Sequence, residues 1–332
     1  MKTLKRLLCS LLVAACTFGC AAFGGCGGDA ADYKIGVLQV ATHTALDESR
    51  EGFIETLEKW ANENGKTIKF DLQNANGDSN NEKSMAASLV SKNCDLLLGI
   101  ATSSARALVT ATTKTPVLFT AVTDPSSGNI KGPNVSGTSD MAPIDKQIDL
   151  IKKLVPDCKK IGFLYCSGEE NSKKQIEIAK SRCDVAGIET KEFTVTATSD
   201  IQTVVETINP DEIDAVFIPT DNLLAANMTL ACGVLTPKGI PVIAGEAGMC
   251  EDGEALATLS IDYRNLGSQT AEIAIRILKG EKVSDIPFEY YNRETEFVIN
   301  EKNAKDLLAK NPSLKITESD ISALKEEFSK NA

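Results

Sequence analysis

Three consecutive hydroxyl residues, Thr102-Ser103-Ser104, follow an apolar run of strand length at 95–100. The pattern predicts a strand that ends where a helix begins. The free N–H groups and the positive dipole end of such a helix attract anions, and hydroxyl groups add hydrogen-bond donors. We therefore expect a ligand carboxylate at this point. The alternative is that Thr102 or Ser103 only caps the helix.

A carboxylate and an amide, Asp221-Asn222, come directly after a second apolar run at 215–219. An acidic side chain opposite an anion-binding helix start suits a zwitterion, which needs one group for its carboxylate and another for its ammonium. We expect Asp221, with Glu169 or Glu246, to take the ammonium, and Asn171 and Asn222 to orient it. The alternative is that Asp221 only caps the following helix.

Catalytic chemistry has little support in this chain. It contains a single histidine, His43, although histidine is the most frequent general acid or base. We find no nucleophile elbow, Walker loop, dinucleotide fingerprint or HExxH motif. The cysteines include no C-x-x-C pair and no Cys/His cluster, so we expect no metal. We predict a protein that is not an enzyme and needs no cofactor, with His43 lining a cleft or its rim; an extracellular hydrolase is the remaining catalytic alternative.

The elements that position these residues alternate regularly between strand and helix, and each break is marked by Gly, Pro, Asp or Asn. The pattern runs through two successive rounds. It predicts an α/β fold with two Rossmann-like lobes, each a parallel sheet with helices on both faces. Strands are predicted at 34–40, 67–72, 95–100, 116–121, 160–165, 189–194, 215–219, 241–244, 256–261 and 288–299, and helices at 46–64, 80–92, 103–113, 144–154, 172–186, 201–208, 222–235 and 266–278.

A late strand region after the second round predicts that the chain crosses back between the lobes through a multi-strand hinge. We expect residues 33–139 with about 263–283 in the first lobe, and 140–262 with about 284–310 in the second. Residues 311–332 are predicted to form a C-terminal tail. In doubly wound sheets, ligands bind at the carboxyl ends of the strands, which is where the polar residues described above lie.

The N-terminus has a cationic start, an apolar segment at 7–23 and then Gly24-Gly25-Cys26-Gly27-Gly28. This predicts a lipoprotein signal peptide at 1–25, lipid attachment at Cys26 and a polar tether at 26–32. The protein would then be extracytoplasmic and lipid-anchored to the cell membrane. Cys16 and Cys20 are alternative attachment points, and an uncleaved N-terminal helix is the alternative to export.

The chain of 332 residues has 35 basic and 46 acidic residues, and loss of 1–25 removes three basic ones, giving a net charge of −14. So acidic a surface argues against nucleic-acid binding, which needs clustered Lys and Arg. Four of the ten cysteines fall at or before the anchor, and we expect the other six to be free thiols.

Several short motifs together resemble the substrate-binding lipoproteins of ABC importers, and in particular the tryptophan/tyrosine-binding family. The resemblance runs from about Tyr33 to Leu308. The motifs are 39–47, Arg50-Glu51-Gly52-Phe53, Gly99-Ile100-Ala101-Thr102, Phe119-Thr120-Ala121-Val122-Thr123-Asp124-Pro125, Gly137-Thr138-Ser139-Asp140, Pro219-Thr220-Asp221-Asn222 and Ile261-Asp262-Tyr263-Arg264-Asn265-Leu266-Gly267.

The resemblance implies a type I periplasmic-binding fold with three crossing segments, closing as a monomer around an aromatic amino acid for delivery to an ABC permease and ATPase. A sensor or chemoreceptor partner would use the same cleft and is the alternative. Relatives often have Thr-Pro-Ala where this chain has Thr102-Ser103-Ser104, which adds a hydroxyl. The expected ligand-binding residues are Gln39, Leu46, Thr102, Ser103, Ser104, Val122, Thr123, Ser167, Glu169, Asn171, Asp221, Asn222 and Glu246.

Overall fold

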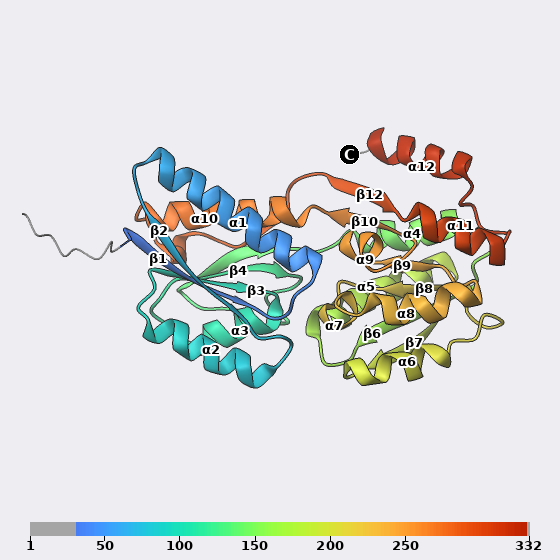
Figure 1. The fold of residues 1–332 in the computed structure, drawn as a ribbon, viewed down its shortest axis with the longest axis horizontal. Coiled ribbons are helices and arrows are strands. Elements are labelled where there is room, and N and C mark those ends of the chain that lie inside the picture. Colours follow the sequence, from blue (N-terminus) through green and yellow to red (C-terminus); the bar gives the residue numbers. More distant parts are fainter. Residues whose placement is uncertain (1–30, 331–332) are drawn as a thin grey trace, which may run out of the picture. The chain divides into compact units, whose positions relative to one another are not determined.

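The computed structural model describes residues 31–330, which contain two six-stranded sheets (Figure 1). The predicted signal peptide, Cys26 and most of the predicted tether lie outside the described residues. Among residues 31–330, no helix has both the length and the apolar composition needed to cross a bilayer. The six cysteines of this part carry free thiols, and five of them are buried.

The first sheet is entirely parallel, with strand order β11-β5-β4-β3-β1-β2. Helices α1 and α10 cover one face and α2 and α3 cover the other (Figure 1). This lobe contains β1 (Tyr33–Gln39), α1 (Thr44–Glu63), β2 (Ile68–Asn74), α2 (Ser79–Ser91), β3 (Leu96–Ile100), α3 (Thr102–Ala111), β4 (Val117–Val122), β5 (Val135–Ser139), α10 (Tyr263–Leu278), the 3₁₀ helix η2 (Val283–Asp285) and β11 (Glu289–Tyr290).

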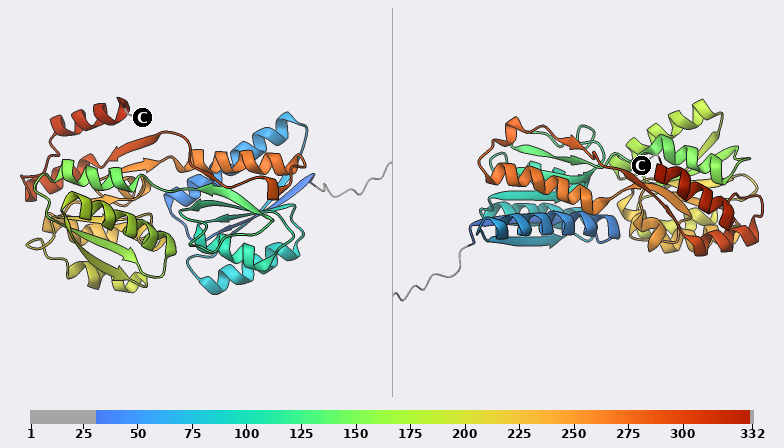
Figure 2. Two further views of the ribbon diagram at one scale, coloured as in Figure 1. Left: turned by 180° about the vertical axis from the view of Figure 1, so that it is seen from behind. Right: turned by 90° about the horizontal axis from the view of Figure 1, so that it is seen from above.

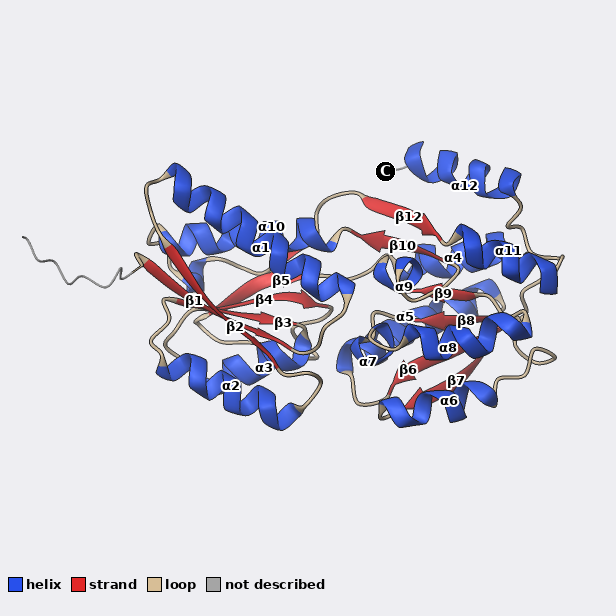
Figure 3. Cartoon of the chain, in the orientation of Figure 1, coloured by secondary structure: helices blue, strands red, loops and turns tan. Residues whose placement is uncertain are grey.

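The second sheet has the order β12-β10-β9-β8-β6-β7 and is parallel except for β12, which runs antiparallel to β10 (Figure 3). Residues of α4, α5, α11 and α12 pack on one face, and residues of α6 and α8 on the other. The lobe contains α4 (Ile144–Leu154), β6 (Lys160–Cys166), α5 (Glu170–Ala186), β7 (Glu189–Val195), α6 (Thr198–Glu206), β8 (Ala215–Ile218), α7 (Asn222–Ala225), α8 (Met228–Leu235), the 3₁₀ helix η1 (Thr236–Lys238), β9 (Val242–Ala244), α9 (Gly248–Glu251), β10 (Ala257–Ile261), β12 (Thr295–Ile299), α11 (Glu301–Lys310) and α12 (Glu318–Lys330).

Strand β3 shows why the central strands read as unbroken apolar runs. Leu96 and Leu98 pack in the core beneath α1 and α10, whereas Leu97 packs on the opposite face beneath α2 and α3. Successive side chains of a strand point to opposite faces, so a strand covered by helices on both sides must be apolar at every position. The fold class expected from the alternation of elements is therefore confirmed, with two mostly parallel α/β sheets.

Helices α1 and α10 cross at a pair of glycines, and the view from above shows them side by side (Figure 2). A Cβ at Gly52 would lie 2.0 Å from the Arg264 carbonyl oxygen, and a Cβ at Gly267 would lie 2.0 Å from that of Ser49. Only glycine permits so close an approach of two backbones. The crossing fixes the beginnings of α1 and α10 next to each other, at the carboxyl end of the first sheet.

Within residues 31–330 the chain passes between the two sheets three times: after β5, after β10 and after β11. The late strand region expected at 288–299 is in fact two strands in different sheets, because β11 pairs with β5 and β12 pairs with β10. The last crossing therefore falls between Tyr290 and Thr295 rather than near residue 284.

Two further expectations differ from the structure. The helix expected at 222–235 is broken into α7 and α8, where the Asn227 amide donates to the Leu223 carbonyl at 2.7 Å and competes with the helical ladder. The expected C-terminal tail is an integral part of the second lobe, since Ile321 and Leu324 of α12 are buried and the Phe328 ring lies 5.1 Å from that of Phe297.

Candidate functional site

A cavity with about 300 Å³ of empty space lies where the carboxyl ends of the strands of both sheets meet. Its walls come from the segments that follow β1, β4 and β5 of the first sheet and β6, β8, β9 and β10 of the second sheet. No Lys or Arg belongs to its lining. The lining residues are His43, Ala45, Leu46, Ala121, Thr123, Asp140, Asn171, Thr220, Asp221, Asn222, Ala225, Glu246, Met249 and Tyr263.

Three carboxyl groups, those of Asp140, Asp221 and Glu246, face this cavity and are almost fully buried, with 1–3% of each residue exposed. Burial raises the pKa of Asp140 to about 6 and that of Glu246 to about 8. Burial, and then the charge of Glu169, raises the pKa of Asp221 to about 7. Desolvation disfavours the ionised form, so a cation in the cavity would be strongly favoured.

The two oxygens of Asp221 are already engaged within the second lobe. Oδ1 accepts from the Leu224 N–H at 3.0 Å, which caps α7. Oδ2 accepts from the Cys166 N–H at 2.6 Å and from the Ser172 hydroxyl at 2.7 Å. The carboxylate therefore ties α7 and α5 to the end of β6, in addition to facing the cavity.

Asp140 differs from Asp221 because one of its oxygens has no partner. The Tyr263 hydroxyl donates to Oδ2 at 3.0 Å, and the hydroxyls of Tyr263 and Thr123 partly offset the rise that burial causes in the pKa of Asp140, whereas Oδ1 is buried and unpaired. Asp140 follows β5 and Tyr263 begins α10, so both residues stand on segments that cross between the lobes. A buried carboxylate oxygen without a partner is an acceptor ready for a donor that a ligand brings.

The two lobes are in direct contact around the cavity. The Gln175 amide of α5 donates to the Thr123 hydroxyl at 2.9 Å, and His43 Nε2 lies 3.2 Å from Asn222 Oδ1. At the rim, Arg106 forms an ion pair with Glu170 at 3.3 Å. The structure is therefore a closed arrangement in which the cavity is enclosed by both lobes.

The hydroxyl run at the start of α3 lies outside the cavity lining. The hydroxyls of Ser103 and Ser104 donate to Oε1 of Glu82 at 2.7 and 2.9 Å, and Glu82 is itself buried. Thr102 is buried with an unpaired hydroxyl, but it does not line the cavity. A carboxylate does sit by this helix start, as the residue pattern led us to expect, but it is the protein's own Glu82 from α2.

Of the thirteen residues expected to bind ligand, six line the cavity: Leu46, Thr123, Asn171, Asp221, Asn222 and Glu246. Besides the α3 hydroxyls, four others do not. Gln39 bonds Asp47 and Arg50, Val122 packs in the core, and the Ser167 hydroxyl donates to Val195 O. Glu169 lies behind the wall, where it accepts from Asn171 and Asn222.

Asp140 and Tyr263 are the main polar lining residues that we did not predict as ligand-binding. A signal for Asp140 was present, because it is a carboxylate placed directly after a short run of residues at 135–139. The sequence analysis predicts no strand in that run, whereas it forms β5 in the first sheet. His43 lines the cavity, in the position expected for it.

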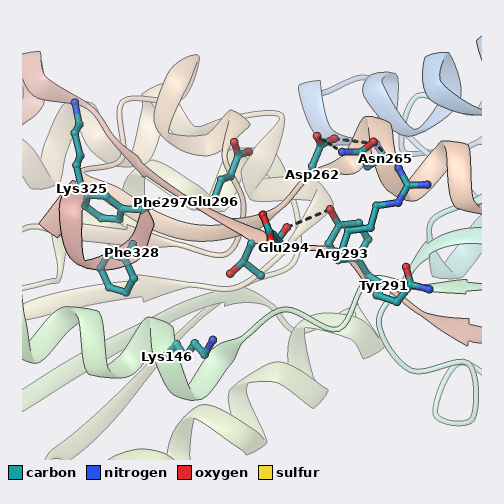
Figure 4. Close-up of a pocket in the computed structure, with 12 residues that line it drawn as sticks. Lys146, Asp262, Asn265, Tyr291, Arg293, Glu294, Glu296, Phe297, Lys325 and Phe328 are labelled. Carbon is teal, nitrogen blue, oxygen red and sulfur yellow. Dashed lines mark hydrogen bonds between the residues drawn. The ribbon is translucent and has the colours of Figure 1, made fainter. Parts of the chain in front are cut away.

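A larger groove lies along the last crossing segment, with about 1720 Å³ of space that is continuous with solvent (Figure 4). Its polar groups largely satisfy one another: Arg293 donates to Asn265 Oδ1 at 2.7 Å, and the Tyr291 hydroxyl donates to the Glu294 carbonyl. Phe297 and Phe328 close one end. Because this groove is open to solvent and its polar groups pair with one another, the smaller cavity between the lobes is the candidate site.

Comparison with known proteins gives a consistent family. The profile of the ABC transporter substrate binding proteins matches residues 34–316. A tyrosine-binding protein of Clostridioides difficile is 39% identical over 280 residues, which is 82% of this chain and 80% of that protein.

Two solved structures show related proteins in two states, one with ligand bound and one ligand-free and open. An ABC domain from Streptococcus pneumonia in complex with L-Trp is 34% identical, covers 87% of this chain and 97% of its own, and has a TM-score of 0.80. A substrate-binding protein with adhesive properties from Clostridium difficile, in its ligand-free, open structure, is 38% identical and covers 83% of this chain and 94% of its own, but has a TM-score of 0.64. The chain thus superposes better on the tryptophan complex than on the more similar sequence in its open state.

Proposed function

The chain belongs to the family of ABC transporter substrate-binding proteins, and from that premise we propose that it captures an aromatic amino acid as a zwitterion between its lobes. The observation that carries the proposal is the cavity between the lobes, whose lining has three buried carboxyl groups and no Lys or Arg. A buried cluster of acidic groups requires a positive charge to offset the cost of desolvation. An amino acid supplies that charge as its ammonium group.

Asp140 receives the ammonium, because its Oδ1 is the carboxylate oxygen in the lining that is buried and unpaired. Asp221 and Glu246 add negative potential nearby, although hydrogen bonds from Leu224, Cys166 and Ser172 already occupy Asp221. We therefore assign the hydrogen bond to the ligand ammonium to Asp140, whereas the sequence led us to expect it at Asp221. A charge-assisted hydrogen bond of this kind is among the stronger ones in proteins.

The carboxylate of the ligand lies at the start of α1. His43, which precedes this 20-residue helix, makes no side-chain capping hydrogen bond to it, and Ala45 and Leu46 of the first turn line the cavity. The unsatisfied N–H groups and the positive dipole end of a long helix favour an anion there. Leu46, Ala225 and Met249 provide the apolar wall that an aromatic ring needs.

Closure of the lobes around the amino acid produces the form that a membrane permease recognises, and a lipid on Cys26 keeps the protein extracytoplasmic and within reach of that permease. The tryptophan-bound and tyrosine-binding relatives support the ligand class. The better superposition on the L-Trp complex than on the open protein supports closure as the bound state. Mass spectrometry of the mature N-terminus, with Cys16 and Cys20 as alternatives, tests the anchor.

A thermal-shift screen of the twenty amino acids, with nucleosides and sugars as controls, tests the ligand class directly. A ligand at one hundred times its dissociation constant stabilises the folded state by roughly 2.7 kcal/mol. We expect aromatic amino acids to give the largest shifts, and calorimetry to return one site per chain. Shifts confined to sugars or nucleosides would overturn the proposal.

A further inference from the structure

Two buried polar atoms in the cavity lining lack a hydrogen-bond partner: Asp140 Oδ1 and His43 Nδ1. Buried polar atoms are satisfied in the great majority of cases, so each one that is not requires an explanation. The ammonium of the proposed ligand accounts for Asp140. His43 Nδ1 is left, and its chemistry depends on where the imidazole carries its proton.

A chain of hydrogen bonds fixes the tautomer of His43. The Asn222 side-chain N–H₂ donates to Glu169 Oε2 at 2.6 Å, and a carboxylate oxygen can only accept from it. The amide orientation of Asn222 is thereby settled, and its Oδ1 is the atom that lies 3.2 Å from His43 Nε2. A carbonyl oxygen can only accept, so Nε2 carries the hydrogen and Nδ1 of the neutral ring is an acceptor.

The surroundings keep the imidazole neutral and its partner in place. Burial lowers the pKa of His43 below its ordinary value. Glu169 also accepts from the backbone N–H groups of Asn222 and Leu223, at 3.1 and 3.0 Å, so the start of α7 holds the chain of hydrogen bonds rigidly. The lone pair of Nδ1 therefore has a fixed direction, on a residue that lines the cavity.

The ligand offers two kinds of hydrogen-bond donor, its ammonium and any N–H or O–H on its side chain, because its carboxylate can only accept. The proposed function assigns the ammonium to Asp140. The donor that remains for His43 Nδ1 is therefore an N–H or O–H of the ligand's side chain.

We propose that His43 Nδ1 accepts a hydrogen bond from an N–H or O–H at the end of the ligand's side chain, and so selects tyrosine or tryptophan over phenylalanine. This inference rests on the proposed function and adds to it the residue that distinguishes one ligand side chain from another. Phenylalanine would bury the Nδ1 lone pair without a donor. Sites built to hydrogen-bond a substrate group reject the analogue that lacks it, because a buried partner is then left unsatisfied.

Calorimetric titration of L-tyrosine, L-tryptophan and L-phenylalanine into the wild type and into His43→Phe tests the proposal. We expect the wild type to bind tyrosine or tryptophan at least about tenfold more tightly than phenylalanine. His43→Phe should lose that preference, because it keeps an aromatic ring but offers no acceptor. Arg106→Ala is the control: it removes a contact between the lobes at the rim, away from the cavity lining, and should change the affinity for all three ligands by a similar factor.

The chain has one histidine, so nitrogen NMR of protein labelled at histidine observes His43 alone. We expect a neutral Nε2–H tautomer at neutral pH, because burial lowers the pKa of His43, and an Nδ1 resonance that shifts with tyrosine or tryptophan but not with phenylalanine. This readout reports the hydrogen bond itself and does not depend on the stability of a variant.

The outcomes separate this inference from the proposed function. If no amino acid binds, the proposed function fails. If amino acids bind, but phenylalanine binds as tightly as tyrosine and tryptophan, the role of His43 is overturned while the proposed function stands. An equal loss of all three ligands in His43→Phe beyond the loss in Arg106→Ala would place the ammonium, rather than the side chain, at His43 and would also overturn the inference.

Discussion

The start of α3 and the cavity between the lobes both gather buried polar side chains at the carboxyl ends of strands, but they complete their hydrogen bonds differently. At α3, Glu82 accepts from both Ser103 and Ser104, and the one unpaired hydroxyl there, that of Thr102, does not line the cavity. In the cavity, Asp140 Oδ1 and His43 Nδ1 remain unpaired. Polar composition alone therefore does not identify a ligand site. A buried polar atom that lacks a hydrogen-bond partner and belongs to a cavity lining is the better indicator.

We expect the largest change in amino-acid affinity from a substitution in the cavity. Asp140→Asn removes the negative charge but keeps the shape, and it should weaken amino-acid binding by about ten- to a hundredfold, or roughly 1.5–3 kcal/mol for a charge-assisted hydrogen bond. Calorimetry measures the affinity. The ligand-free variant should unfold at or above the temperature of the wild type, because the buried charge is costly on its own.

Asp221→Asn is the comparison for that variant. Asp221 caps α7 and accepts from Cys166 and Ser172, so its loss should lower the free energy of unfolding as well as affinity. If Asp140→Asn left affinity intact while Asp221→Asn abolished it without loss of stability, the ammonium would belong at Asp221.

The next effect concerns the start of α3. Glu82→Ala leaves the hydroxyls of Ser103 and Ser104 without their acceptor, and should lower the free energy of unfolding by about 1–3 kcal/mol. Amino-acid affinity should change less than about threefold, since neither serine lines the cavity. Chemical denaturation and calorimetry measure the two quantities. A large loss of amino-acid affinity with an unchanged free energy of unfolding would show that the start of α3 belongs to the binding site.

The pH dependence of binding should be smaller but distinctive. The pKa of Asp140 is raised to about 6 by burial, so this carboxyl favours the folded, ligand-free protein below its ordinary range near pH 4 and opposes it as the pH rises through 6. An ammonium reverses the preference. Affinity should therefore fall about tenfold between pH 7 and pH 5, with proton release visible in buffers of different ionisation enthalpy.

Asp140→Asn is the control for that titration and should flatten it over the same interval. A residual slope above pH 7 would report Glu246, whose pKa burial raises to about 8. Affinity that rises on acidification would contradict the ammonium assignment.

The smallest effect is expected at the rim. Arg106 and Glu170 form an ion pair across the lobes with more than a third of each side chain exposed. Exposed pairs contribute about 0–1 kcal/mol, so Arg106→Ala should change affinity by at most about fivefold, and less at high salt. A hundredfold loss on titration would show that closure depends on the rim instead of the interior.

The sequence predicted the fold well, because apolar runs such as Leu96–Ile100 can only be strands covered on both faces. It missed the identity of β11 and β12, which are short and lie in one continuous stretch. Which sheet each joins depends on where the chain crosses between lobes, and no local pattern encodes that crossing. The helical C-terminal segment was also missed, although its Leu324 is buried in the second lobe.

The site was harder to predict than the fold. Residue type at the end of a strand correctly suggested where polar groups gather, but not which of them satisfy one another. Nothing near Ser103 in the sequence indicates that Glu82, 21 positions earlier, would take its hydroxyl hydrogen. Conversely, the open oxygen of Asp140 is defined by what is absent around it, which only the packed structure reveals.

The crossing of α1 and α10 at Gly52 and Gly267 also sets an order of assembly. The ribosome delivers α1 more than two hundred residues before its partner helix, and most of the second lobe is made in between. Until α10 arrives, the face of α1 around Gly52 has no neighbour and the first sheet lacks β11. The first lobe, which is synthesised first, is thus completed late. A chain that ends before residue 263 would contain β1 to β5 of this lobe but would lack α10 and β11.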